Sequence, residues 1–223
     1  TQGVGIYLEN ARDVSLSNLN FNGTFSNFGI RGESVNNFTL RDSDVNATQF
    51  GTNSSVSQPE GAIRFGTPSV STGLTGTALF EGNSIGTGSF SDGVGIYSYG
   101  SGSLNLTIRD NATSGDQAVF NPGANSGITV NDSVFIETGG TISLVATITN
   151  VDFTGARGDQ LQITAAANTT QNLTITGNTF EQSFVNALGG GVRLGGGGNN
   201  DYHVTYNFSN NNIHGATLRP LRA

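Results

Sequence analysis

The amino-acid sequence predicts an all-β protein built from short, repeated strands. Gly, Asn, Thr and Ser make up close to half of its 223 residues, and these residue types are poor helix formers. No stretch keeps the apolar spacing of i, i+3, i+4 and i+7 that marks an amphipathic helix. Hydrophobic residues nevertheless reach 35% of the chain. This is enough for a packed core and distinguishes the chain from disordered low-complexity segments.

A short pattern recurs along the chain: an apolar residue, four mostly polar residues and a second apolar residue. In each copy an Asn or Asp follows the first apolar residue by two or three positions, and these residue types tolerate the left-handed backbone of a sharp bend. We therefore expect each copy to form a strand, a two-residue bend and a second strand. The copies span residues 16–21, 40–45, 80–85, 108–113, 130–135, 148–153, 175–180 and 208–213.

A second element precedes most of these copies. It is a short segment, usually entered through Gly or Ala, in which aliphatic residues alternate with Tyr, Arg or Gln. Such alternation predicts a strand with its aliphatic side chains inside and the others outside. The segments are residues 5–8, 29–31, 62–65, 95–97, 118–120, 160–163 and 191–194.

Three segments carry a resemblance to a known family: GVGIYLENARDVSLSNLNFNG, FGIRGESVNNFTLRDSDVNA and QNLTITGNTFEQ. They resemble the right-handed parallel β-helix repeats of the pectate-lyase-like superfamily, and the resemblance covers about residues 3–215. It implies a single-stranded, right-handed parallel β-helix with three short strands per coil, three parallel sheets around an apolar core, and Asn residues stacked at the bend.

From the repeat count we expect about eight coils in one domain over residues 1–223. The segment 139–154 departs from the pattern, and we expect a shortened or irregular coil there. The resemblance does not imply one activity, because enzymes, phage tailspikes and surface adhesins share this fold.

The charge and residue content exclude several classes of function. Cys is absent, so disulfides, thiolate catalysis, zinc fingers and iron–sulfur sites are ruled out. Lys is also absent, and the net charge is −7. A nucleic-acid partner is not expected, because the chain has no basic cluster to contact phosphates. Membrane insertion is not expected either, because no apolar run approaches the ~18 residues of a spanning helix.

Charged residues are only 11% of the chain, so the surface must consist mainly of Asn, Thr, Ser and Gly. Such a surface is typical of extracellular β-proteins, and we expect a secreted or cell-surface location. The first residues show no signal-peptide core, and the chain contains no Met. We therefore expect it to be a segment excised from a longer protein.

Acidic residues precede several of these short strands, namely Glu60, Asp92, Asp116 and Asp159. Glu60, Asp92 and Asp116 are expected on three consecutive coils at one sheet edge, about 5 Å apart between neighbouring coils. Retaining glycosidases need roughly this carboxylate separation and inverting ones a larger one, so the row is a candidate catalytic set with Arg64 beside it. The same three carboxylates could instead hold calcium, which prefers oxygen ligands. The plain alternative is that each acidic residue simply ends a turn.

The segment Ser91-Asp92-Gly93 resembles the Asp-Gly strand entry of β-helical polysaccharide hydrolases. The other parts of that signature, a paired-Asp motif, a Gly-His motif and an Arg-x-Lys motif, do not occur in the sequence. Outward tyrosines offer flat surfaces on which sugars could stack. The candidates for glycan contact are Tyr7, Tyr97 and Tyr99, with Tyr202 as a further platform.

The leading hypothesis is a non-catalytic β-helical segment of a secreted or cell-surface bacterial protein, acting as an adhesin-like stalk or a rod that contacts glycans. Its partner would be a polysaccharide or a cell-surface glycan, and no cofactor is expected apart from calcium. The first alternative is a polysaccharide lyase or glycoside hydrolase that uses the acidic row. The second is a fibre module that associates end to end.

Overall fold

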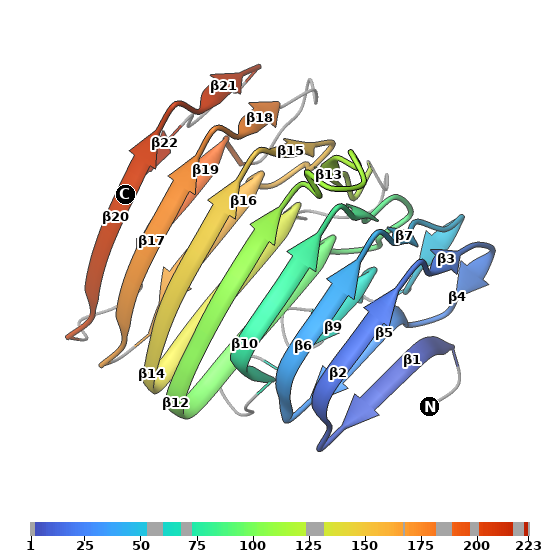
Figure 1. Ribbon diagram of the computed structural model, residues 1–223, viewed down its shortest axis with the longest axis horizontal. Coiled ribbons are helices and arrows are strands. Elements are labelled where there is room, and N and C mark those ends of the chain that lie inside the picture. Colours follow the sequence, from blue (N-terminus) through green and yellow to red (C-terminus); the bar gives the residue numbers. More distant parts are fainter. Residues whose placement is uncertain are drawn as a thin grey trace.

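The computed structural model of the chain is all-β and describes residues 3–52, 60–67, 73–123, 132–166, 168–181, 189–196, 201–215 and 221–222. These ranges contain no helix, and every pairing between their strands is parallel. Successive passes of the chain lie side by side (Figure 1), and they add strands to three rows. This strand order is consistent with the predicted parallel β-helix.

The first row forms one part of the largest sheet. Its strands pair in the order in which the chain reaches them, so each pass stacks on the one before. They are β1 (Val4–Glu9), β5 (Phe28–Glu33), β9 (Ile63–Phe65), β12 (Val94–Arg109), β14 (Val134–Thr149), β16 (Leu161–Ala165), β19 (Val192–Gly196) and β22 (Leu221–Arg222).

The second row belongs to the same sheet and includes the later halves of β12 and β14. Its other strands are β2 (Arg12–Ser17), β6 (Val35–Arg41), β10 (Leu74–Glu81), β17 (Thr170–Thr176) and β20 (His203–Ser209).

Strands β12 and β14 depart from the predicted three short strands per coil, because each runs through both rows without a break. Their register is continuous from Val94 opposite Val134 to Arg109 opposite Thr149. Glycines with positive φ lie in the middle of both strands, where they let the backbone turn while it stays in the sheet. In the segment 139–154, where a shortened or irregular coil was expected, β14 thus differs from the three-strand pattern but keeps its register with β12 and β17.

The third row forms a separate sheet on the far side of the bends. A further short pair joins β4 (Thr24–Phe25) to β8 (Gln49–Phe50). The strands of the third row are β3 (Asn20–Phe21), β7 (Asp44–Val45), β11 (Ser84–Ile85), β13 (Ala118–Phe120), β15 (Val151–Thr154), β18 (Thr179–Glu181) and β21 (Asn212–His214).

The bends between the second and third rows have the predicted left-handed backbone. Asn18, Asp42, Asn150 and Asn210 have φ values of 53°, 47°, 56° and 56°. Their side chains carry little strain there because Asn and Asp populate this region more readily than other residues with a Cβ.

Behind two of these bends lies the Asn ladder that the resemblance implied. Asn178 is 1% exposed; its side chain accepts a bond from the Val151 N–H at 3.0 Å and donates to the Ile148 carbonyl at 3.0 Å. Asn211 in turn accepts a bond from the Asn178 N–H at 2.9 Å and donates to the Ile175 carbonyl at 2.8 Å.

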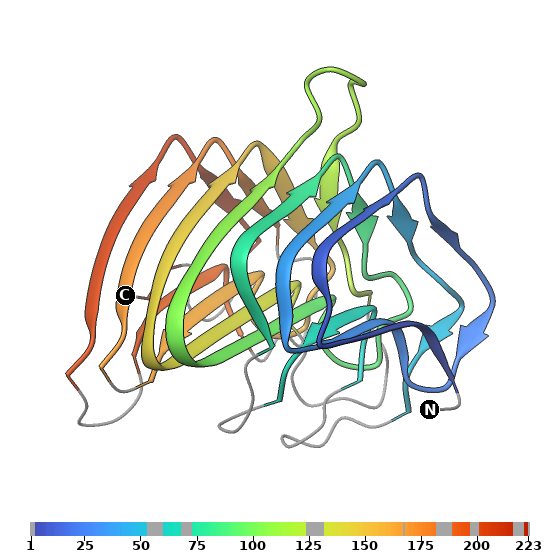
Figure 2. The ribbon, with the colours of Figure 1, turned by 60° about the horizontal axis from the view of Figure 1, so that its bottom comes forward.

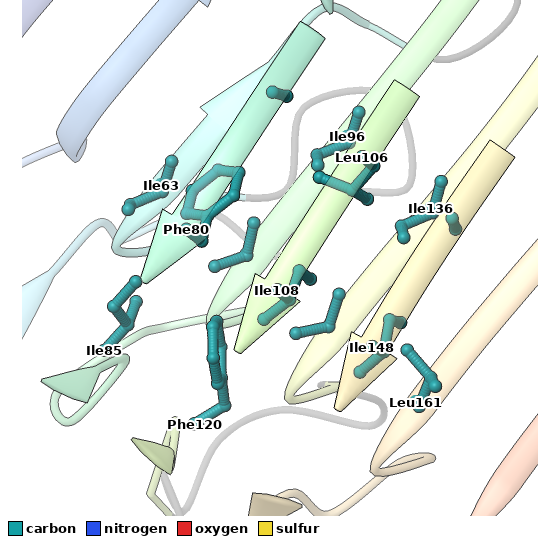
Figure 3. Close-up of a cluster of buried hydrophobic side chains, with 14 of the residues drawn as sticks. Ile63, Phe80, Ile85, Ile96, Leu106, Ile108, Phe120, Ile136, Ile148 and Leu161 are labelled. Carbon is teal, nitrogen blue, oxygen red and sulfur yellow. The ribbon is translucent and has the colours of Figure 1, made fainter. Parts of the chain in front are cut away.

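The core is the space enclosed by the three rows, where equivalent apolar side chains stack from strand to strand (Figure 3). Phe120, Phe153 and Phe180 stack in the third row with ring centroids 5.6 and 4.9 Å apart. Burial of such a column depends on the neighbouring passes, so stability comes from stacking. A column of the second row consists of Leu40, Phe80, Ile108, Ile148, Ile175 and Phe208.

Residues 118–120 form a strand as predicted, but in the third row instead of the first. The cause is the segment 110–117 between β12 and β13, which replaces the expected two-residue bend and stands out from the rod (Figure 2). The next first-row strand therefore begins at Val134, inside the copy 130–135 that was predicted to be a bend. Residues 124–131 lie outside the described ranges.

Candidate functional site

Three carboxylates form an acidic ladder, Asp92, Asp132 and Asp159, just before the first-row strands β12, β14 and β16. Each accepts a hydrogen bond from the backbone of the next pass. The Asp132 N–H donates to Asp92 Oδ1 at 3.0 Å, and the Asp159 N–H donates to Asp132 Oδ1 at 2.7 Å. The Gly190 N–H continues the series to Asp159 Oδ1 at 2.7 Å. The ladder thus connects four successive passes at one edge of the first row.

Glu60 lies beside this ladder but turns its carboxylate to a different part of the molecule. Its Oε1 accepts a bond from Asn27 Nδ2 at 2.7 Å, and its Oε2 accepts one from the Thr52 N–H at 2.7 Å. The main chain at Glu60 still pairs with the pass that carries Asp92, since the Ser91 N–H donates to the Glu60 carbonyl at 2.7 Å. The Glu60 side chain, 7% exposed, is therefore held by the preceding pass.

Burial changes the proton affinity of two carboxyls in the acidic ladder. Burial raises the pKa of Asp92 to about 6, although the Asp132 N–H and the Arg64 charge both favour the ionised form. The pKa of Asp132 is also raised well above its usual value, first by burial and then by the charges of Asp92 and Asp159. Neighbouring carboxylates resist simultaneous ionisation, so Asp132 holds its proton more tightly than a separate carboxyl would.

Arg64 and Tyr97 lie on the outer face of the first row, next to Asp92. The Arg64 guanidinium carbon is 4.8 Å from the centroid of the Tyr97 ring, and its Nε donates to the Gly66 carbonyl at 3.0 Å. A Cβ on Gly95 would lie 3.7 Å from the Tyr97 ring and 3.8 Å from Asp92 Oδ2. Both are ordinary van der Waals separations, so the carboxylate and the aromatic ring lie near the same point of the sheet, beside Gly95.

The same face continues into a shallow cavity around Arg31. Arg31 is aligned with Arg64 across β5 and β9, donates to the Gly66 carbonyl at 2.8 Å and pairs with Glu33. Burial is the largest influence on Arg64 and lowers its pKa to about 10, while the nearby Arg31 charge acts in the same direction. The cavity has a volume of about 240 Å³ and is lined by Val4, Tyr7, Asn27, Phe28, Arg31, Glu33 and Arg64.

Asp116 does not join this site, and the prediction that it lies in one row with Glu60 and Asp92 is wrong. It belongs to the protruding segment between β12 and β13, where its carbonyl accepts a bond from the Asn111 N–H at 2.8 Å. The proposed calcium set of these three carboxylates is therefore not assembled. Within the described residues, no group of three or more His, Cys, Asp or Glu side chains is placed to hold a metal ion.

The candidate glycan-contacting tyrosines are placed differently from one another. Tyr7 is 42% exposed, as expected for an outward residue, but Tyr97 is only 5% exposed. The Tyr97 ring lies on the outer face as expected, but it is covered by packing against Arg64 and against Phe135, whose centroid is 5.3 Å away. The Tyr99 hydroxyl donates to the Glu137 carboxylate. Direct stacking of a sugar on Tyr97 is therefore blocked.

Asp132 is the site residue that the sequence analysis missed, because it was assigned to a bend. The signal was present in the sequence. Asp92, Asp132 and Asp159 each precede a pattern of apolar residue, any residue and Ile, beginning two positions later. Comparing these segments with one another would have placed Asp132 in the row in place of Asp116.

The site combines a chain of backbone-bonded carboxylates with a covered Arg64, Asp92 and Tyr97 cluster. Perturbed pKa values in such a cluster are typical of functional sites but also of structural charge networks.

No helix long and apolar enough to span a membrane occurs in the described part of the chain. Compared with known proteins, the chain matches no family model, no curated protein and no solved structure.

Proposed function

We propose that the chain is a right-handed parallel β-helix that serves as a non-catalytic segment of a secreted or cell-surface protein, as an adhesin-like stalk or a glycan-contacting rod. The all-parallel strand order and the stacked core support the fold. A surface dominated by uncharged polar residues, with charged residues at only 11% of the chain, supports an extracellular role.

The observation that carries the non-catalytic proposal is the use made of the acidic ladder. Asp92, Asp132 and Asp159 each accept a backbone N–H from the following pass. A glycosidase needs one carboxyl that delivers a proton to the substrate and a second that attacks or activates water. The ladder carboxyls are instead engaged in joining one pass to the next, which is a structural task.

The experiment is an incubation of the purified protein with polygalacturonate, alginate, xylan and a β-glucan, each with calcium and with a chelator. We expect no release of reducing ends and no ultraviolet absorbance from unsaturated products over hours. A commercial lyase or hydrolase on each substrate shows that the assay detects cleavage. Cleavage that is lost in Asp92→Asn would overturn the non-catalytic proposal.

A polysaccharide-cleaving enzyme is the competing proposal, and the Asp92 environment favours it. A carboxyl with a pKa of about 6, close to a buried guanidinium, has the proton affinity of a general acid near neutral pH. The matched control is Asp159→Asn, since Asp159 shares the ladder geometry and precedes β16, three passes from Arg64. An enzyme centred on Asp92 would lose activity in Asp92→Asn and keep it in Asp159→Asn.

A further inference from the structure

The outer face of the second row is uncharged over its last strands. We define the hydroxyl face by Thr107, Thr147, Thr149, Thr174, Thr176 and Asn207, which project outward from β12, β14, β17 and β20. Register places Thr107, Thr147, Thr174 and Asn207 directly beside one another. Thr149 and Thr176 form a second column, two residues further along their strands.

The polar groups of the hydroxyl face recur both from strand to strand and along each strand, because the sheet fixes their positions. Neighbouring strands are about 4.8 Å apart, and outward residues within a strand are about 6.6 Å apart. Polar groups therefore recur at every strand along the rod. A ligand that repeats along its own length can meet equivalent groups on each strand, whereas a small molecule would meet only one or two.

The polar side chains of this face are not used inside the protein. Among the described residues, no side-chain hydrogen bond or ion pair involves the six residues of the hydroxyl face. On earlier strands of the same row, some outward side chains are engaged within the protein. There the Asn37 side chain donates to Asp13 at 2.7 Å and accepts from the Thr77 N–H at 2.8 Å. The hydrogen-bonding capacity of the hydroxyl face is thus left for water or a ligand.

The charge of the face selects the class of ligand. The second-row residues of β14, β17 and β20 include no Asp, Glu, Arg or Lys. The charged part of the row ends at Arg109 of β12, which lies directly beside Thr149. Arg109 and Arg41 both pair with Glu81 at 2.7 Å. An acidic polymer would find only Arg109 at the border of the face, already paired with Glu81, and would be repelled by a chain of net charge −7. The exposed Val145, at 42%, adds an apolar contact suited to the C–H groups of a sugar ring.

We propose that the hydroxyl face is the glycan-binding surface of the rod, and that its ligand is a neutral, extended polysaccharide lying across β12, β14, β17 and β20. The sugar hydroxyls would exchange hydrogen bonds with Thr and Asn side chains on successive strands. This proposal rests on the proposed glycan-contacting function, to which it adds the surface and the charge class of the ligand.

The test measures binding by isothermal titration calorimetry and by electrophoresis through gels that contain the polysaccharide. The neutral probes are xyloglucan, galactomannan and a soluble β-glucan, and the acidic probes are polygalacturonate and alginate. We expect binding to at least one neutral probe and to neither acidic one, with little dependence on salt because no charges meet. Thr174→Lys should weaken this binding by about tenfold or more, because its long charged side chain would lie in the middle of the face.

The matched control is Thr39→Lys, which puts the same side chain at the corresponding outward position of β6, outside the hydroxyl face. We expect it to bind as the unaltered protein does, and circular dichroism with urea unfolding should show that both variants are folded. Equal loss in both variants, or no loss in Thr174→Lys, would overturn the assignment of the face while leaving glycan binding in place. Preference for an acidic probe would overturn the ligand class. Binding to no polysaccharide would reject the glycan-contacting function itself.

Discussion

Asp132 is 3% exposed and lies between two other carboxyls, those of Asp92 and Asp159. Its side chain is useful to the fold as an acceptor for the Asp159 N–H, not as a charge. We expect Asp132→Asn, which keeps the acceptor and removes the repulsion, to be at least as stable as the unaltered protein near pH 7. Asp132→Ala leaves the N–H without that acceptor and should be less stable than Asp132→Asn by about 1–3 kcal/mol. Urea unfolding measures both, and equal stability of the two variants would contradict this role.

The raised pKa values of Asp92 and Asp132 give the stability a defined pH dependence. A carboxyl whose pKa is higher in the folded state binds protons more tightly there than in the unfolded chain. For Asp92 the free energy of unfolding should therefore fall as the pH rises from the ordinary pKa of 3.8 to about 6, where its contribution is lost. The raised pKa of Asp132 acts in the same direction. Urea midpoints across this range should show it, and Asp92→Asn combined with Asp132→Asn should flatten the slope. A slope unchanged in the double variant would refute the assignment.

The acidic residues also mark how far the sequence could predict the site. Glu60 and Asp92 lie just before first-row strands and Arg64 lies within one, as expected, because Gly or Ala entry and alternation identify those strands. Asp116 was misplaced, since nothing in the residues 108–113 reveals that the bend there is replaced by a longer segment. Side-chain directions, such as that of Glu60 toward Asn27, depend on neighbouring passes and could not be read from a single segment.

At the scale of the structural element, the bend between β14 and β15 depends on one buried amide, that of Asn178 in the next pass. Asn178→Ala would leave the Val151 N–H and the Ile148 carbonyl without their partner. We expect a loss of about 1–3 kcal/mol for each group left unsatisfied. Urea or thermal unfolding would measure the loss.

The matched control for that variant is Asn150→Gly. Asn150 occupies that same bend, is exposed and has a φ of 56°, which glycine adopts without strain. This variant should stay within about 0.5 kcal/mol of the unaltered protein. A comparable loss at both positions would mean that the bend itself, and not the buried amide, determines the stability.

The strands themselves were predicted more successfully than their grouping into coils. Alternation and apolar spacing located β5, β9, β17 and β18, because a half-buried strand must alternate. The joining of two rows within β12 and β14 was not predicted. It arises from glycines whose φ values are set by the neighbouring strands, and the sequence alone does not distinguish such a turn from a loop.

For the whole molecule, register is a stricter requirement than length. A single Gly inserted after Val145 would shift the rest of β14 by one position and exchange its inner and outer side chains. We expect this variant to lose its cooperative unfolding transition. A short Gly-Ser insertion after Ser114, in the exposed protruding segment, should leave the transition almost unchanged. Circular dichroism during urea unfolding compares the two, and equal tolerance would contradict the observed pairing.

The protruding segment between β12 and β13 shows what this tolerance means for evolution. The rod can accept new residues at its corners while every strand keeps its partners, so loops can lengthen, shorten and diversify without disturbing the interior. Over many generations such a chain would lose any fixed period in its sequence and still retain one architecture. Each corner is then a place where a new contact surface can arise on an unchanged support.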